Sequence, residues 1–133
     1  GFAGKASDVP SLHHVPLLVI APGLKPGITA RTGGQVDVIP TLAQLAGWHS
    51  PQASLGHSLL DARPDPARGT LCVRGNIIER IEDKGWMAHD LRQRVTASPG
   101  LREDDALAME GRLLAMYQVA HTLLLRNRIY PMD

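Results

Sequence analysis

Cysteine is almost absent from this chain of 133 residues, which contains only Cys72. A single cysteine excludes an internal disulfide framework and any zinc site built from several cysteines. Aromatic residues make up only 4% of the sequence, so a hydrophobic core has to be built from aliphatic side chains. No apolar run approaches the roughly 20 residues that span a bilayer. The first residues also lack the pattern of a signal peptide.

An excess of charge of either sign is missing as well. The chain has 14 basic and 13 acidic residues, a net charge of +1. This balance gives no reason to expect nucleic acid or an anionic membrane as a partner. Hydrophobic residues make up 44% of the chain and charged residues 20%, which is typical of one globular domain of ordinary size.

Residues 14–47 form the stretch around which the rest can be arranged. Residues 15–21 are apolar apart from Pro16, and Pro22 and Gly23 follow them. A short, unbroken Val/Ile/Leu run of this kind predicts a strand buried on both faces, as in a parallel or mixed sheet between helices. Pro16 is tolerated at the start of such a strand, where a missing N–H costs least.

A short helix is predicted after this strand. Asp37 is a good N-cap, and its carboxylate also suits the positive end of the helix dipole. Gly47 is the expected stop. Between them, apolar residues recur at helical spacing: Val38, Ile39, Leu42, Leu45 and Ala46. An alternative is that Asp37 is a catalytic carboxylate.

An antiparallel meander is predicted next, with strand candidates at 70–74, 77–82, 86–90 and 92–96. Asp83, Lys84 and Gly85 between two of these runs indicate a hairpin turn. We expect one polar sheet face carrying Arg74, Glu79 and Glu82.

Two side chains of the meander, and the helix that follows it, can also be interpreted from the sequence. His89 is expected on the strand surface, and Cys72 is expected as a small buried residue. Residues 103–128 predict a long helix with one apolar stripe, formed by Met109, Leu113, Met116, Ala120 and Leu123.

Three residues near the N-terminus are candidates for a binding site. Lys5 lies in a loop, where it is either a solvated surface lysine or a cation that holds a phosphate or sulfate oxygen. His13 and His14 are adjacent, and neighbours in an extended segment point to opposite faces, so at most one enters a given site. Each is either a surface or satisfied histidine, or an imidazole that ligates a metal or hydrogen-bonds an anion.

Four segments together resemble the C-terminal part of sulfatases of the alkaline-phosphatase superfamily. They are HVPLLVIAPGLKPG at 14–27, GGQVDVIPTLAQLAGW at 34–48, GHSLL at 56–60 and YQVAHTLLLRNRIYP at 117–131. The nearest likeness is to bacterial membrane-anchored sulfatase-like proteins, which include lipoteichoic-acid synthases and phosphoglycerol transferases. The resemblance runs through nearly the whole chain.

The resemblance implies an α/β fold with a mixed, largely parallel sheet flanked by helices, then a small antiparallel sheet and a long C-terminal helix. Residues 1–133 would be the C-terminal portion of one sulfatase-like domain. In it, 1–69 would belong to the main sheet, and 70–133 would form the meander and the last helix. A fragment of a sheet exposes a strand edge, so a dimer in isolation is expected to be possible.

The resemblance also implies the chemistry of a parent enzyme, a metal-dependent sulfate-ester hydrolase or a phosphoglycerol or phosphoethanolamine transferase. Its divalent metal (Mn, Mg, Ca or Zn) would be held mostly by residues outside this chain. The formylglycine signature Cys-x-Pro-x-Arg is absent, because Val73, Arg74 and Gly75 follow Cys72. We therefore expect this chain alone to be inactive. The alternative is a non-catalytic sulfatase-like binding or interaction module.

Only a substrate-binding role carries over to individual residues. Sulfatases have an anion-binding lysine eleven positions before the proline of a Val-Pro strand, and Lys5 stands eleven before Pro16. His14, immediately before that strand, and His13 are weaker matches. No residue is assigned as catalytic or as a metal ligand.

The resemblance also implies partners and a cellular setting. The implied partners are a sulfate- or phosphate-ester substrate and the upstream remainder of the parent. The implied setting is a bacterial inner membrane, with the domain in the periplasm or outside the cell.

Overall fold

The structure is a computed structural model, and it describes residues 11, 13–28, 30–48, 54–61, 65 and 68–126. The elements whose bounds lie within the described residues are a 3-10 helix, two α-helices and four strands. In chain order they are η2 (Gln35–Asp37), α2 (Val38–Leu45), β1 (Gly69–Arg74), β2 (Ile77–Glu82), β3 (Gly85–His89), β4 (Arg94–Ala97) and α3 (Glu103–Leu125). Within the described part of the chain, no helix is both long enough and apolar enough to cross a membrane.

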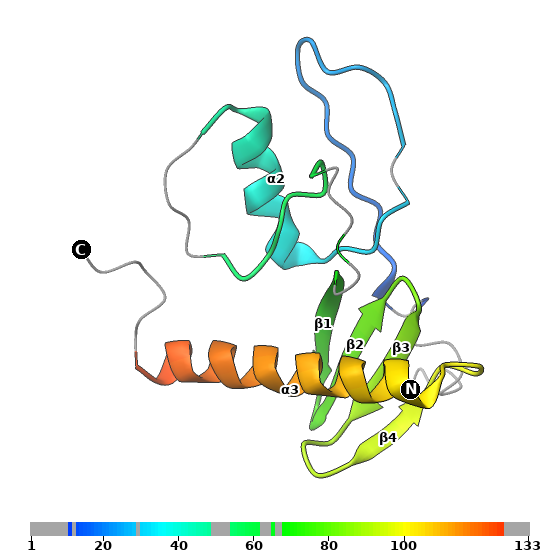
Figure 1. The fold of residues 1–133 in the computed structure, drawn as a ribbon. Coiled ribbons are helices and arrows are strands. Elements are labelled where there is room, and N and C mark those ends of the chain that lie inside the picture. The colour runs from blue at the N-terminus through cyan, green and yellow to red at the C-terminus, as the bar shows by residue number, and fades with distance from the viewer. Residues whose placement is uncertain are drawn as a thin grey trace.

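The strands form one antiparallel sheet in the order β1-β2-β3-β4, so the predicted meander is confirmed (Figure 1). Asp83 and Lys84 form the turn between β2 and β3, as expected, and Glu82 pairs with Gly85 across it. β2 is a central strand, and its Glu79 lies between Cys72 of β1 and Ala88 of β3.

Helix α3 covers one face of this sheet, and the main core lies between them. The buried cluster consists of Ile78 and Met87 from the sheet and Ala106, Met109 and Leu113 from α3. The predicted apolar stripe is therefore confirmed for the first half of the helix. The second half of α3 extends past β1 (Figure 1), and Met116, Ala120 and Leu123 are only partly buried. The helix ends at Leu125, slightly before the predicted end at residue 128.

The predicted short helix is confirmed as α2, and Gly47 follows it with a positive φ of 66°. Asp37 occupies the N-cap position, but its carboxylate makes no capping bond to α2. Its Oδ2 accepts from Gly34 N at 2.8 Å, and its Oδ1 accepts from His57 N at 2.7 Å. The buried carboxylate therefore ties the residues before α2 to the loop that follows it. A Cβ on Gly56 would lie 2.2 Å from Val36 O, so this close approach requires glycine.

The prediction of a mixed, largely parallel sheet is wrong for this structure. All strand pairs in the described residues are antiparallel. Residues 15–21 are extended but form no strand, and Leu18 and Ile20 are 82% and 87% exposed. The physical reason is that a buried strand needs neighbouring strands for its N–H and C=O groups, which an apolar run cannot provide by itself.

Two smaller predictions about the sheet are also wrong. Glu79 and Glu82 do not share a polar face, because residues three apart on a strand point to opposite sides. Both are buried. His89 is not a surface residue, since it is only 2% exposed and its Nε2 lies 3.1 Å from Glu110 Oε1 of α3. In each case a hydrogen-bonding partner from another element allows a charged or polar group to be buried.

Candidate functional site

The two buried glutamates of β2 each bring cationic or imidazole side chains together. Glu79 points to the sheet face opposite α3, and Glu82 points to the face that α3 covers. Burying an ionised carboxylate is costly unless it is paired and hydrogen-bonded. The partners of these two groups therefore define the places where polar chemistry is concentrated in the described residues.

Glu79 binds a histidine and an arginine, one on each carboxylate oxygen. His13 Nε2 lies 2.5 Å from Oε2, and Arg74 Nη2 donates to Oε1 at 2.9 Å. Arg74 comes from β1, diagonally across from Glu79, while His13 comes from a segment 66 residues earlier. The Glu79 side chain is 0% exposed and that of His13 is 24% exposed, so the cluster runs from the sheet to the surface.

Cys72 is the neighbour of Glu79 on β1, and its surroundings make it a weak nucleophile. Partial burial, and then the negative charge of Glu79, raise the pKa of the Cys72 thiol above its ordinary value. The thiol is therefore protonated at neutral pH, and the thiolate is the nucleophilic form. Cys72 was expected to be a small buried residue, and the structure shows it as only partly buried.

On the other face, Glu82 is shared by two arginines. Arg80 Nε donates to Oε1 at 2.5 Å, while Arg112 of α3 donates to both carboxylate oxygens at 2.8 and 2.7 Å. The bidentate pair with Arg112 fixes α3 on the sheet, because two parallel bonds define both distance and orientation.

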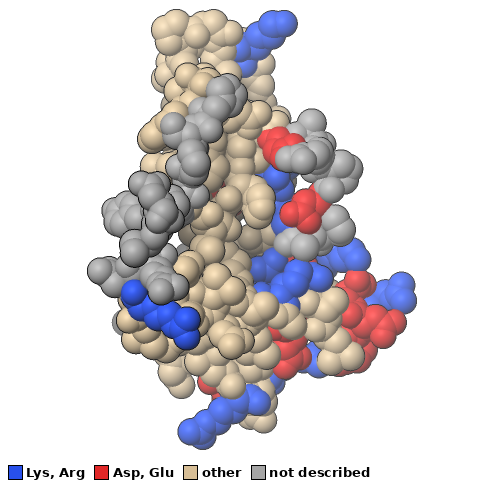
Figure 2. Space-filling view, turned by 60° about the vertical axis from the view of Figure 1, so that its left-hand side comes forward, with Lys and Arg blue, Asp and Glu red and all other residues tan. Residues whose placement is uncertain are grey.

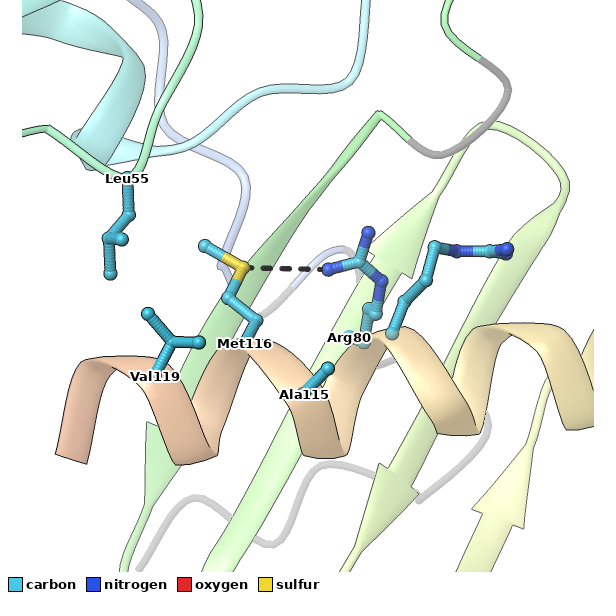
Figure 3. A pocket seen from close by; sticks show the side chains of 6 residues that line it. Leu55, Arg80, Ala115, Met116 and Val119 are labelled. Atoms are coloured by element: carbon cyan, nitrogen blue, oxygen red, sulfur yellow. Dashed lines mark hydrogen bonds between the residues drawn. The ribbon is translucent and has the colours of Figure 1, made fainter. Parts of the chain in front are cut away.

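A pocket of about 330 Å³ lies beside this arginine–glutamate group (Figure 3). Its lining is mostly apolar and comes from β2, α3 and the loop after α2: Leu55, Arg80, Arg112, Ala115, Met116 and Val119. Two of these lining residues contact each other, because Arg80 Nη1 donates to Met116 Sδ at 3.7 Å. The guanidinium groups that border it are already engaged with Glu82, so the pocket has apolar walls and little free charge.

The three residues predicted to bind substrate have different outcomes. Lys5 lies outside the described residues. His14 is exposed at the start of the extended segment, and no hydrogen bond or ion pair of its side chain is found in the described part of the chain. His13 is held by Glu79, as described above. The structure therefore does not bring His13 and His14 into one site.

Sequence reasoning missed Glu79 as a partner of His13. A signal was present, because Glu79 lies in the middle of the run Ile77-Ile78-Glu79-Arg80-Ile81. A charged residue flanked by β-branched residues in a strand needs a partner when the strand is central. The pattern does not say which residue supplies that partner, since His13 is distant along the chain.

A divalent metal, which the sulfatase resemblance implies, does not fit the described residues by themselves. Across the described ranges, no three His, Cys, Asp or Glu side chains lie close enough together to hold a metal ion. The histidine–glutamate pairs are each satisfied by arginine or backbone groups rather than by a third ligand.

An uncharged surface lies apart from these clusters. Between residues 14 and 30 the only charged side chain is Lys25, and α2 has none. Figure 2 shows the upper part of the molecule, which holds residues 14–28 and α2, as largely uncharged, whereas acidic and basic side chains gather lower down. Exposed apolar side chains on this surface include Val15, Leu18, Ile20, Ile39, Leu42 and Trp48.

Comparison with known proteins gives one partial similarity. A stretch of 48 residues, 35% of this chain, is 44% identical to arylsulfatase K of Homo sapiens. That stretch covers 9% of the length of arylsulfatase K. No family model and no solved structure matches the chain. Part of the chain is therefore similar to part of a sulfatase.

Proposed function

We propose that this chain is the C-terminal part of a larger metal-dependent sulfate-ester hydrolase and that it is catalytically incomplete alone. The observation that carries the proposal is the 44% identity to arylsulfatase K over 48 residues. A sulfate ester is preferred over a phosphoglycerol or phosphoethanolamine group because the relative is named as a sulfatase. The nucleophile and the metal ligands would belong to the remainder of the parent protein.

The uncharged surface of residues 14–28 and α2 supports a larger parent. Large apolar side chains at positions such as Leu18 and Ile20 lose free energy in water, at about 25 cal/mol per Å² of apolar area. Large contiguous apolar patches on a protein surface mark interfaces. The backbone of residues 14–20 also makes no hydrogen bond to other described residues. The rest of the parent would cover both.

The experiment is an assay of the whole parent protein beside this chain. Both are purified and given 4-methylumbelliferyl sulfate with and without added Mn²⁺, Mg²⁺ or Ca²⁺, after chelator treatment. We expect metal-dependent turnover by the parent and none by the 133-residue chain. The phosphate ester of the same fluorophore is the matched control, and the sulfate ester is expected to be the better substrate.

Three results would contradict parts of this proposal. Turnover by the chain alone would show that its catalytic set is complete. Preference for the phosphate ester would move the parent to the phosphotransferase branch. A parent that binds the sulfate ester without turning it over, while correctly folded and loaded with metal, would instead support a non-catalytic binding module.

A further inference from the structure

We propose that Glu79 is a positioning residue for His13, which it holds so that the other ring nitrogen, Nδ1, contacts the anionic group of the ester. This inference rests on the proposed function. It assigns a role to Glu79, a residue of the small antiparallel sheet, and it specifies which nitrogen of His13 does the binding.

The geometry determines which ring nitrogen carries the proton that is shared with Glu79. His13 Nε2 lies 2.5 Å from Glu79 Oε2. An ionised carboxylate only accepts hydrogen bonds, so Nε2 must be the donor. A carboxylate that binds one ring nitrogen fixes both the tautomer and the orientation of an imidazole. Nδ1 is then the nitrogen that remains for a ligand.

Glu79 is well suited to this task because it is itself immobile. Its side chain is 0% exposed, and β2 is paired on both sides, with Cys72 and Ala88 as the neighbours of Glu79. Arg74 occupies the second carboxylate oxygen, so the carboxylate cannot rotate without losing a charged hydrogen bond. The imidazole is therefore supported by a rigid group rather than by a loop.

The chain contains two histidines that serve as comparisons. His89 uses both ring nitrogens, since Nε2 lies 3.1 Å from Glu110 Oε1 and Nδ1 accepts from Leu91 N at 2.8 Å. His14 has no hydrogen bond or ion pair of its side chain in the described part of the chain. His13 is intermediate, because Nε2 is bound and Nδ1 makes no hydrogen bond to the residues that the structure describes, and its side chain reaches the surface with 24% exposure. Of these three histidines, His13 alone combines a ring held by a carboxylate with a nitrogen that contacts no other described residue.

The charges around His13 suit an anion. Glu79 and Arg74 offset each other, so a protonated imidazole leaves the cluster with a net charge of +1. Nδ1–H can then donate a charge-assisted hydrogen bond to a sulfate oxygen, a stronger bond than one between neutral groups. In this role His13 binds and orients the ester, and it takes no part in bond making or breaking.

The test is nitrogen-15 NMR of the histidine rings in the full 133-residue chain, followed by titration with inorganic sulfate at constant ionic strength. In the wild type, we expect the neutral His13 ring to be a single Nε2–H tautomer. At a pH where the ring is protonated, we expect its Nδ1 signal to shift saturably with sulfate. The signals of His14 and His89 should not show saturation. In Glu79→Leu, we expect mixed His13 tautomers and sulfate binding weakened about tenfold.

The His89 ring reports folding in the same spectra, because its contact with Glu110 Oε1 exists only if the sheet and α3 are packed. If Glu79→Leu disrupts this contact, His13→Gln provides the second variant and should abolish the saturable sulfate response of the neighbouring amides. A wild-type His13 with mixed tautomers, or without a saturable response, overturns the inference whatever the variants do.

The outcomes also separate this inference from the proposed function. A sulfate-responsive His13 with a fixed tautomer, in a chain whose parent hydrolyses no sulfate ester, would support the positioning role and contradict the hydrolase. A parent with sulfatase activity whose His13 ignores sulfate would support the hydrolase and overturn the role of Glu79.

Discussion

The sheet with α3, residues 69–126, and the preceding part, residues 11–61, use their apolar side chains in opposite ways. The sheet and α3 bury theirs against each other, with Met87, Met109 and Leu113 fully inaccessible to water. In the preceding part only Asp37, Thr41 and Ala43 are buried among the described residues, whereas Leu18 and Ile20 are exposed. One region has a core closed between the sheet and the first half of α3, and the other presents an apolar surface.

The two regions also differ in what polar groups do. In the sheet and α3, ion pairs such as that of Glu82 with Arg112 accompany a hydrophobic core. In the preceding part, the buried Asp37 and Thr41 organise the loop by accepting backbone N–H groups of His57 and Leu59. Side-chain hydrogen bonds from Asp37 and Thr41 therefore fix the loop after α2, although the apolar side chains of α2 and residues 14–28 remain exposed.

The largest expected effect comes from removing the shared carboxylate of the sheet region. In Glu82→Ala, Arg80 and Arg112 lose the group that both bind, and Arg80 is buried. Removing one partner of a buried ion pair costs about 3–5 kcal/mol. We expect the free energy of unfolding to fall by this amount in a urea titration followed by circular dichroism.

The matched control for Glu82→Ala is Asp104→Ala, which removes an exposed carboxylate paired with Arg102 at 3.8 Å. Exposed pairs contribute about 0–1 kcal/mol. Equal effects of the two substitutions would mean that burial of the Glu82 carboxylate does not determine how much its ion pairs stabilise the sheet region.

A smaller and more local effect is expected from Asp37→Asn. An amide has one oxygen in place of two, so Gly34 N or His57 N loses its acceptor and faces an NH₂ group instead. An unsatisfied buried donor costs about 1–3 kcal/mol. Hydrogen exchange should become faster at the amides of Gly34, His57 and Leu59, while the amides of β2 and β3 stay protected.

The control for Asp37→Asn is Asp90→Asn, because Asp90 Oδ1 also accepts two backbone N–H groups, those of Arg92 and Gln93. It lies on the turn between β3 and β4, so its effect should stay within that turn. Faster exchange throughout the sheet in Asp37→Asn would show that the two regions unfold as one unit.

The smallest expected effect is the acid sensitivity of surface ion pairs around α3. The hydrogen bond from Arg94 lowers the pKa of Glu103 below its ordinary 4.5, and the hydrogen bond from Lys84 lowers the pKa of Asp105 below its ordinary 3.8. A lowered folded pKa means that the stabilisation is complete above the ordinary value and is lost as the pH falls through the folded value. Stability should therefore decline below about pH 4.5.

The double variant Glu103→Gln, Asp105→Asn should show a shallower decline in the urea midpoint between pH 5 and pH 2. Asp104→Asn serves as the control and should leave the slope as in the wild type. A double variant with the wild-type slope would assign the acid sensitivity to other carboxylates. Glu103 is exposed and Asp105 is partly exposed, so the difference is expected to be modest.

Several elements were predictable because their signals are local. The turn at Asp83 and Lys84, the stop at Gly47 and the alternation of the meander follow from backbone preferences and side-chain periods. The stripe of α3 predicted which side chains face the sheet, and Met109 and Leu113 do so. Such patterns are determined by a few neighbouring residues, so they survive in any tertiary context.

The errors share a different origin. Residues 15–21 have the composition of a buried strand, but pairing depends on a partner strand that the run itself does not encode. His89 and Glu79 were misassigned because their partners, Glu110 and His13, lie 21 and 66 residues away. Only the folded chain brings such groups into contact.

The sequence by itself therefore determined the helices, the meander and a likeness to sulfatases, because these depend on local patterns and on residue identity. The tertiary structure decided which glutamates are buried, which histidine has a free nitrogen and which apolar segment is left uncovered. Those properties depend on contacts between distant residues, whose free energy appears only when the chain has folded.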